Sequence, residues 1–173
     1  MELLKNTEIR LRAPEPEDLD VFYRWENDTE LWKYGATLMP YSRYDLKNYL
    51  ASSSHNIYRD NQLRLMIEQL SSGCTIGIID LYDFEPHPGR AAVGILVDRD
   101  FRNKKVASQA IELLSTYAFS FLHIHQLYAH IPLSNAPSLS LFEKNGFVRS
   151  GVLKDWISAP EGYEDVVIMQ KVN

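Results

Sequence analysis

The chain has 173 residues, of which 45% are hydrophobic and 24% charged, and its formal net charge at pH 7 is −5. This is an ordinary globular composition, and the length suits one domain over residues 1–173. The negative charge argues against a nucleic-acid partner, and a lone cysteine, Cys74, excludes an intramolecular disulfide and a cysteine zinc site. No window has the roughly 18 apolar residues of a membrane span, and the N-terminus lacks the apolar core of a signal peptide. We therefore expect a cytoplasmic protein without a membrane partner.

Alternating and amphipathic patterns predict the elements of the first third. Glu8–Arg12 alternates polar and apolar residues, which is typical of a strand. A helix is expected after Pro16, ending at Asn27–Asp28. Its inward side chains would be Leu19, Phe22, Tyr23 and Trp25. A loop or short turn, a second helix and a polar connection are then expected at residues 31–41, 42–51 and 52–61.

The middle of the chain predicts three strands and a long helix. Two strands, Leu63–Leu70 and Cys74–Phe84, are separated by a turn at residues 71–73 and should form a hairpin. A third strand is expected over Ala91–Val97. A helix follows the basic turn Arg102–Lys105, because its apolar residues recur at steps of three and four. These residues are Val106, Ala110, Leu113, Leu114, Tyr117 and Phe121.

The last third predicts a strand, a helix and two closing strands. Gln126–Pro132 reads as a strand, and Asn135–Lys144 as a helix that Gly146 ends. The closing strands, residues 147–153 and 164–171, would flank a loop that contains Pro160 and Gly162. The order predicts an α/β (α+β) fold, with a mixed, mostly antiparallel sheet of six or seven strands and helices on both faces.

The basic turn between a strand and a helix N-terminus predicts an anion site. Unpaired N–H groups point outward at the start of a helix, and the helix dipole adds positive potential. Lys104, Lys105 and Arg102 add charge to the same turn. We interpret it as the site of a coenzyme pyrophosphate; the alternative is an ordinary strand–turn–helix unit with a solvated basic turn.

Two sequence blocks resemble the GNAT superfamily of acyl-CoA N-acyltransferases, and the resemblance covers essentially the whole chain. Arg102, Lys105 and Ala107 match the family's coenzyme loop, which reads roughly Arg/Gln-x-x-Gly-x-Gly/Ala. Asn135, Ser138 and the run 141–147 resemble the family's N-x-x-[SA]-x-x-[LI]-[YF]-E-K-x-G-F block. Residues 9–12 and 162–165 look like the corresponding segments of two branches of the superfamily. One branch acetylates polyamines, and the other acetylates the N-termini of ribosomal proteins.

The resemblance implies direct transfer of an acetyl group from acetyl-CoA to a primary amine, with no metal. The coenzyme would lie where the strands 93–97 and 126–131 splay apart. Its pantetheine amides would pair with backbone groups near Leu96 and Val97. The coenzyme-binding residues are then expected to be Leu96, Val97, Arg102, Asn103, Lys104, Lys105, Val106, Ala107, Asn135, Ser138 and Phe142. Asn135 serves equally well as a helix cap.

Three positions depart from the family pattern. Lys105 replaces the loop glycine, and its side chain would point outward toward the adenosine phosphates. Phe142 replaces a tyrosine that protonates the departing thiolate in many relatives, and phenylalanine donates no proton. Ala92 stands nearest to a glutamate that acts as the base in some relatives. Tyr128 and Ser138 are candidate substitutes for the proton donor, with neither favoured.

The catalytic candidates are therefore Asp80, Asp83 and Ser138, although surface charge explains the two carboxylates as well. Candidates for acceptor binding are Trp32, Tyr34, Tyr82 and Asp83. Glu26, Asp28 and Glu30 would give the acceptor pocket an acidic rim, or form a solvated turn. We predict an acetyltransferase for a small amine such as a polyamine or for a peptide N-terminus, as a possible homodimer. The alternative is a non-catalytic acyl-CoA-binding or regulatory module of the same fold.

Overall fold

The computed structural model describes residues 3–32, 34, 37–52 and 56–173. Its strands are β1 Ile9–Arg12, β2 Leu63–Gln69, β3 Thr75–Glu85, β4 Arg90–Val97, β5 Gln126–Pro132, β6 Val148–Ala159 and β7 Gly162–Val172. Its α-helices are α1 Leu19–Glu26, α2 Thr29–Trp32, α3 Arg43–Ser52, α4 Ile57–Asp60, α5 Val106–Ser120 and α6 Ala136–Lys144. Short 3-10 turns, η1 Pro16–Asp18 and η2 Arg99–Phe101, precede α1 and follow β4.

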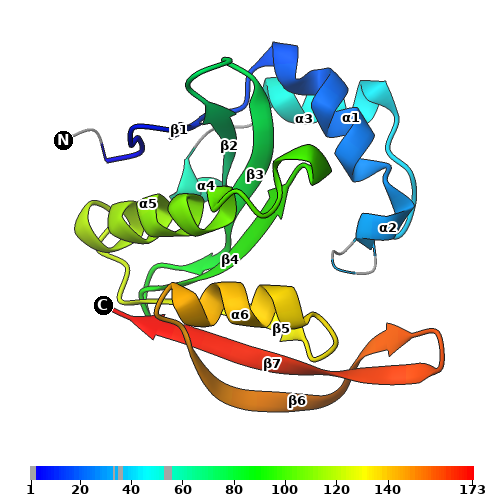
Figure 1. Ribbon diagram of the computed structural model, residues 1–173, viewed down its shortest axis with the longest axis vertical. Helices are drawn as coiled ribbons and strands as arrows, with labels where there is room; N and C mark the ends of the chain where they lie inside the picture. Colours follow the sequence, from blue (N-terminus) through cyan, green and yellow to red (C-terminus); the bar gives the residue numbers. More distant parts are fainter. Residues whose placement is uncertain (1–2, 33, 35–36, 53–55) are drawn as a thin grey trace.

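The strands form one seven-stranded sheet in the order β1-β2-β3-β4-β5-β7-β6. All neighbours are antiparallel except β4 and β5, which run parallel. This pair is short: it registers only Arg90 with Gln126, Ala91 with Leu127, and Ala92 with Tyr128. Beyond Ala92 the two strands diverge, and we call the space between residues 93–97 of β4 and 129–132 of β5 the wedge. Figure 1 shows β1–β4 above it, and β5–β7 with α6 below.

Helices cover both faces of the sheet, as the sequence predicted. The larger core packs β1–β5 and β7 against α5 and α6, and includes Ile79, Leu114 and Met169 with no exposed surface. A smaller core lies under α1 and α3 and consists of Phe22, Trp25, Leu46, Met66 and Ile78. Because β3 contributes Ile78 to one core and Ile79 to the other, the centre of the sheet is buried on both faces.

Several boundaries differ from the prediction. The segment 31–41 was expected to be a loop or short turn; its first two residues belong to the four-residue helix α2, and residues 33, 35 and 36 lie outside the described part of the chain. The connection 52–61 contains α4, which begins because Asn56 Oδ1 accepts the Tyr58 N–H at 3.0 Å. The closing strands are longer than predicted, and only residues 160 and 161 separate them. Tyr23 was expected inward but is 37% exposed, since α1 buries only Phe22 and Trp25.

A buried carboxylate fixes the start of α1. Asp18, only 3% exposed, accepts two hydrogen bonds from Arg12, at 2.7 and 2.9 Å, and one from the Thr75 hydroxyl at 2.8 Å. It also accepts the Glu15 N–H at 2.8 Å. Burial by itself raises the pKa of Asp18, but these hydrogen bonds outweigh it and hold the pKa below its usual range. Asp18 thus joins η1 to β1 and β3.

We expect Asp18→Asn to lower the free energy of unfolding at pH 7 by about 2–3 kcal/mol, because charge-assisted hydrogen bonds are lost. A lowered folded-state pKa stabilises the protein above the unfolded pKa of about 3.9, and this contribution is lost as pH falls through the folded value. In urea unfolding, the difference in stability between the variant and the wild type should therefore shrink as pH falls below the unfolded pKa. A difference that stays constant with pH would contradict this account.

Candidate active site

A cavity of about 650 Å³ opens on the α1–α3 side of the sheet. Its walls come from α1, α2 and α3 and its floor from β2, β3 and β4, where Gly94, Ile95 and Leu96 line it. These β4 residues also form one edge of the wedge, so the cavity and the wedge meet along β4. A molecule in the wedge and a second molecule in the cavity would therefore lie next to each other.

The cavity floor contains a buried ion-pair network. Arg64 Nε and Nη2 each bond one oxygen of Asp80 at 2.9 Å, and Nη1 lies 3.3 Å from a Glu26 oxygen. The rings of Phe22 and Tyr49 lie 5.7 and 5.6 Å from the guanidinium carbon. Burial lowers the pKa of Arg64, but Asp80 and Glu26 outweigh it and the pKa is raised, so the side chain stays charged. The two aromatic rings and two carboxylates hold this cation in place.

The described lining residues give the cavity a negative charge. Glu26, Asp45, Asp80 and Asp83 contribute carboxylates, and Arg64 is the one cation among them. Trp32, Tyr41, Tyr49 and Tyr82 add aromatic rings to the same lining. Carboxylates and aromatic faces both attract ammonium groups, so the cavity suits a cationic ligand.

Of the predicted acceptor-binding residues, Trp32, Tyr82 and Asp83 line the cavity. Tyr34 is 52% exposed and is not among the described lining residues, so its role in acceptor binding stays a prediction. The expected acidic rim holds for Glu26 alone, because Asp28 and Glu30 instead bond Arg99 at 2.9 and 2.8 Å.

Of the predicted catalytic residues, Asp80 and Asp83 both line the cavity, whereas Ser138 does not. Both oxygens of Asp80 accept hydrogen bonds from Arg64, so this carboxylate is not an open base. Asp83 sits exposed at an irregularity of β3, with a φ of 48°. Ser138 belongs to the first turn of α6, where its N–H bonds Asn135 Oδ1 at 3.2 Å.

The turn 98–105 between β4 and α5 exposes backbone donors. Asn103 and Lys105 both have a φ of 60°, and Lys105 is the N-cap of α5 without a side-chain hydrogen bond. The left-handed Lys105 followed by helical Val106 directs successive N–H groups to one side, an arrangement that binds anions. The long helix α5 adds its dipole there.

The basic side chains of this turn have local partners. Arg102 Nε donates to the Val97 carbonyl at 3.1 Å, and Lys104 Nζ donates to the Asp100 carbonyl at 2.8 Å. The Val97 carbonyl is therefore not the free group that the sequence led us to expect. Lys105 is exposed, as predicted.

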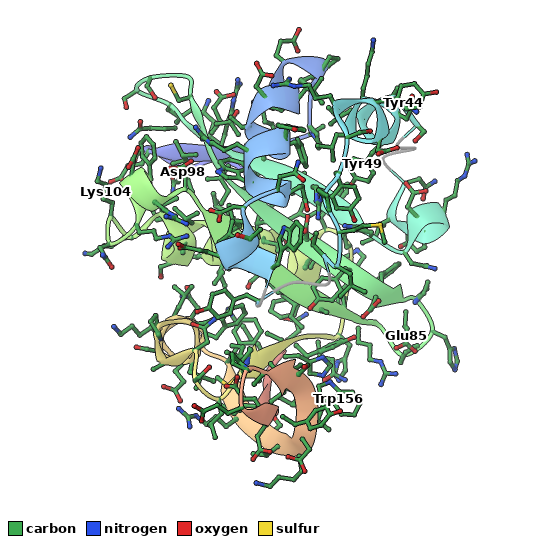
Figure 2. The ribbon with its side chains drawn as sticks, turned by 90° about the vertical axis from the view of Figure 1, so that its right-hand side faces the viewer. Tyr44, Tyr49, Glu85, Asp98, Lys104 and Trp156 are labelled. Atoms are coloured by element: carbon green, nitrogen blue, oxygen red, sulfur yellow. The ribbon has the colours of Figure 1, made fainter. Side chains whose placement is uncertain are left out.

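The turn is anchored to the helices above the cavity. Asp98 accepts hydrogen bonds from Arg24 at 2.7 Å and from the Trp25 indole at 2.9 Å. Arg99 donates hydrogen bonds to Glu30 of α2 and to Asp28, which directly precedes α2. Figure 2 shows Asp98 and Lys104 on the same side of the molecule, away from Glu85, the last residue of β3. These bonds connect the anion turn to the wall of the cavity.

Across the wedge, the α6 residues have structural partners. Asn135 caps α6, so the capping role that we weighed against ligand binding is present. Phe142 is 2% exposed and packs edge-on against Phe147, with ring centroids 4.9 Å apart. Its expected contact with a coenzyme is corrected: the side chain belongs to the core and offers a ligand almost no surface.

Sequence reasoning missed Arg64 and Tyr49. The alternation of Leu63, Leu65 and Ile67 predicts a strand, but it assigns no role to Arg64. Arg64 shares a strand face with the apolar Met66. An apolar residue on that face indicates that the strand is covered on both sides, and this would have pointed to a buried Arg64.

The fold and the two adjoining sites define the class of protein, an N-acetyltransferase. Residues 8–148 match the family described as "Acetyltransferase (GNAT) domain", and the chain belongs to this family. It is 26% identical to a spermidine N(1)-acetyltransferase of Vibrio cholerae, over 93% of this chain and 91% of that protein. An uncharacterized N-acetyltransferase of Bacillus licheniformis is 27% identical over 96% of this chain and 93% of its own.

Solved structures agree with the fold. The spermidine N-acetyltransferase from Vibrio cholerae in complex with CoA and spermine superposes with a TM-score of 0.85, at 25% identity and 96% coverage of both chains. The protein is thus an enzyme that transfers acetyl groups to amines, with the splayed mixed sheet of its family. None of the described helices has the length and hydropathy needed to cross a bilayer. The described residues also contain no cluster of three or more His, Cys, Asp or Glu suited to a metal ion.

Proposed function

We propose that the enzyme uses acetyl-CoA and binds it along the wedge. The pyrophosphate would accept hydrogen bonds from the amides of Lys105, Val106 and Ala107, and the pantetheine arm would lie beside Leu96. The observation that carries this proposal is the meeting of three features along β4: the wedge, the uncapped start of α5 and the cavity. Asn135 and Ser138 would face the arm from the other side.

We propose that the acceptor is the primary amine of a polyamine or a similar small cation. The negative cavity with its aromatic lining supports this, as does the likeness to spermidine acetyltransferases. The amine loses a proton to water, and its nitrogen attacks the thioester carbonyl carbon. The C–N bond forms, the C–S bond breaks, and the nitrogen gives up a second proton to water as the neutral amide forms. The thiolate takes a proton from water, since Phe142 supplies none.

Acetyl transfer to spermidine, compared with transfer to peptides that have a free N-terminus, tests this choice. We expect kcat/KM for spermidine to exceed that for a neutral peptide by at least tenfold. A preference for the peptide would support the second candidate acceptor, a protein N-terminus. The observation that favours this acceptor is the similarity to a putative ribosomal N-acetyltransferase of Bacillus subtilis, which is 26% identical over 57% of this chain and 54% of that protein. Binding of acetyl-CoA without transfer to any amine would support the non-catalytic module.

Lys105→Gly should raise the free energy of unfolding by about 1 kcal/mol, because a left-handed backbone costs lysine about 1–2 kcal/mol and glycine little. Lys105→Ala is the matched control, since it removes the ammonium but keeps the Cβ and hence the strain. Calorimetry should show acetyl-CoA binding two- to fivefold more weakly in both variants, as one charge near the phosphates is lost. A large gain in affinity for Lys105→Gly would instead mean that the lysine hinders the coenzyme.

We also propose that two copies associate through β6. This strand ends the sheet, and it exposes Val148, Val152 and Trp156 by 63%, 49% and 58%. Unpaired apolar edge strands are an aggregation hazard that a partner strand removes. Figure 2 shows Trp156 on β6, in the part of the molecule below the wedge. Sedimentation should give a dimer that Trp156→Glu converts to monomer; a monomeric wild type at micromolar concentration would contradict this.

A further inference from the structure

Three side chains stand in one row across the closed end of the wedge. The register pairs Tyr82 of β3 with Ala92 of β4, and Ala92 with Tyr128 of β5. Residues opposite one another in a sheet point to the same face, so two tyrosines flank a small alanine on the side of the cavity. The row lies at the last residue pair before β4 and β5 separate.

The Tyr82 ring extends from this row toward the wedge. A Cβ added to Gly94 would lie 3.3 Å from Tyr82 Cε1 and 3.8 Å from Cδ1, so the ring covers this glycine. Gly94 is the second residue of β4 beyond the last pair with β5. Tyr82 also lines the cavity, and no described residue forms a hydrogen bond with its hydroxyl. Among the described residues, the phenol therefore has no acceptor for its O–H where cavity and wedge meet.

The environment keeps this phenol protonated. Burial, and after it the nearby Asp83, Tyr128 and Asp80, raise the pKa of Tyr82 to about 12. A phenol with this pKa remains neutral at every pH at which the enzyme would work. It is therefore a hydrogen-bond donor that keeps its proton.

The direction of the coenzyme places its reactive end beside Tyr82. An arm that starts at the α5 amides, beyond the end of β4, runs back along β4 toward Ala92. It must stop where β4 and β5 pair, because ladder hydrogen bonds close the space there. The acetyl group at the end of the arm then lies near Gly94, under the Tyr82 ring.

We propose that Tyr82 is a catalytic residue whose hydroxyl donates a hydrogen bond to the carbonyl oxygen of the acetyl group. This inference rests on the coenzyme site proposed above. When the amine attacks, the carbonyl π electrons move to oxygen, and the Tyr82 O–H stabilises the resulting oxyanion without transferring its proton. The C=O bond then re-forms as the C–S bond breaks. Gly94 leaves the room that the ring needs.

Tyr82→Phe tests the proposal, since it removes only the hydroxyl. We expect kcat to fall about 10²-fold, as when one donor to an oxyanion is removed, with acetyl-CoA affinity by calorimetry and the unfolding midpoint unchanged. Gly94→Ala should also lower kcat, because its Cβ displaces the ring. Tyr44→Phe, on α3 at 73% exposure, should leave kcat unchanged.

Three results would overturn the inference. The first is an unchanged kcat for Tyr82→Phe in a wild-type background that binds and transfers acetyl groups. The second is a loss confined to acetyl-CoA affinity, which would make the hydroxyl a binding group only. The third is a loss of kcat for Tyr128→Phe but not for Tyr82→Phe, which would assign the hydrogen bond to the acetyl oxygen to Tyr128 instead of Tyr82. If the wild type fails to bind acetyl-CoA, the coenzyme proposal itself is wrong and this inference falls with it.

Discussion

Replacing Arg64 with methionine is expected to lower the free energy of unfolding by about 3–5 kcal/mol, which is typical when one partner of a buried ion pair is removed. The side chains of Arg64 and Asp80 are 20% and 15% exposed, so the remaining carboxylates would have little water to replace the guanidinium. Chemical denaturation monitored by tryptophan fluorescence measures this loss. Activity should fall as well, because Glu26 and Asp80 line the cavity.

A double variant separates the charge effect from lost packing. Arg64→Met with Asp80→Leu should recover much of the stability, because replacing a whole buried ion pair by apolar groups is often nearly neutral. Arg149→Met is the surface control: Arg149 bonds Glu143 at 2.7 Å, but the two side chains are 52% and 45% exposed. We expect this control to change stability by less than about 1 kcal/mol. Equal losses at Arg64 and Arg149 would contradict a buried network.

Gly77→Ala is the second substitution for which we expect a large effect, a loss of about 3 kcal/mol. Its new Cβ would overlap the Leu96 carbonyl oxygen and lie 3.0 Å from Ile67 Cδ1. Since the overlap is with backbone, β3 and β4 must move apart. The shift would reach Leu96, which lines the cavity, so the acceptor KM should rise too.

Gly151→Ala is the matched control for this substitution. A Cβ at Gly151 would meet no atom within 4 Å, so we expect a change within about ±0.5 kcal/mol. Thermal unfolding of both variants measures the difference. If Gly77→Ala is as stable as Gly151→Ala, β3 and β4 are not packed as described.

Local signals in the sequence were enough to predict most of the fold. A few neighbouring residues were enough to predict the apolar stripe of α5, the Asn135 cap and the end of α6 at Gly146, whose φ is 84°. The length of β6 and β7 was not, because Pro160 and Gly162 read as a long loop while the actual turn is tight. Cross-strand pairing extends that hairpin, and a local pattern does not report it.

The candidate site was less predictable, because it depends on which faces of the strands are covered. The turn 98–105 follows directly from a strand–helix junction, and its positive φ at Lys105 agrees with the glycine at this position in the family pattern. The Arg64 network and the Tyr82–Ala92–Tyr128 row depend instead on register between strands distant in sequence. The cytoplasmic location and the single domain stay predictions from composition and length.

Amide hydrogen exchange with and without acetyl-CoA tests the central claim most directly. The claim is that the coenzyme binds from the start of α5 along the open edge of β4. We predict that acetyl-CoA slows exchange at residues 105–108 and along residues 93–97 and 129–131, and leaves β1 and the β6–β7 hairpin unchanged. No protection at saturating acetyl-CoA, or protection confined to a surface away from the wedge, would contradict the account.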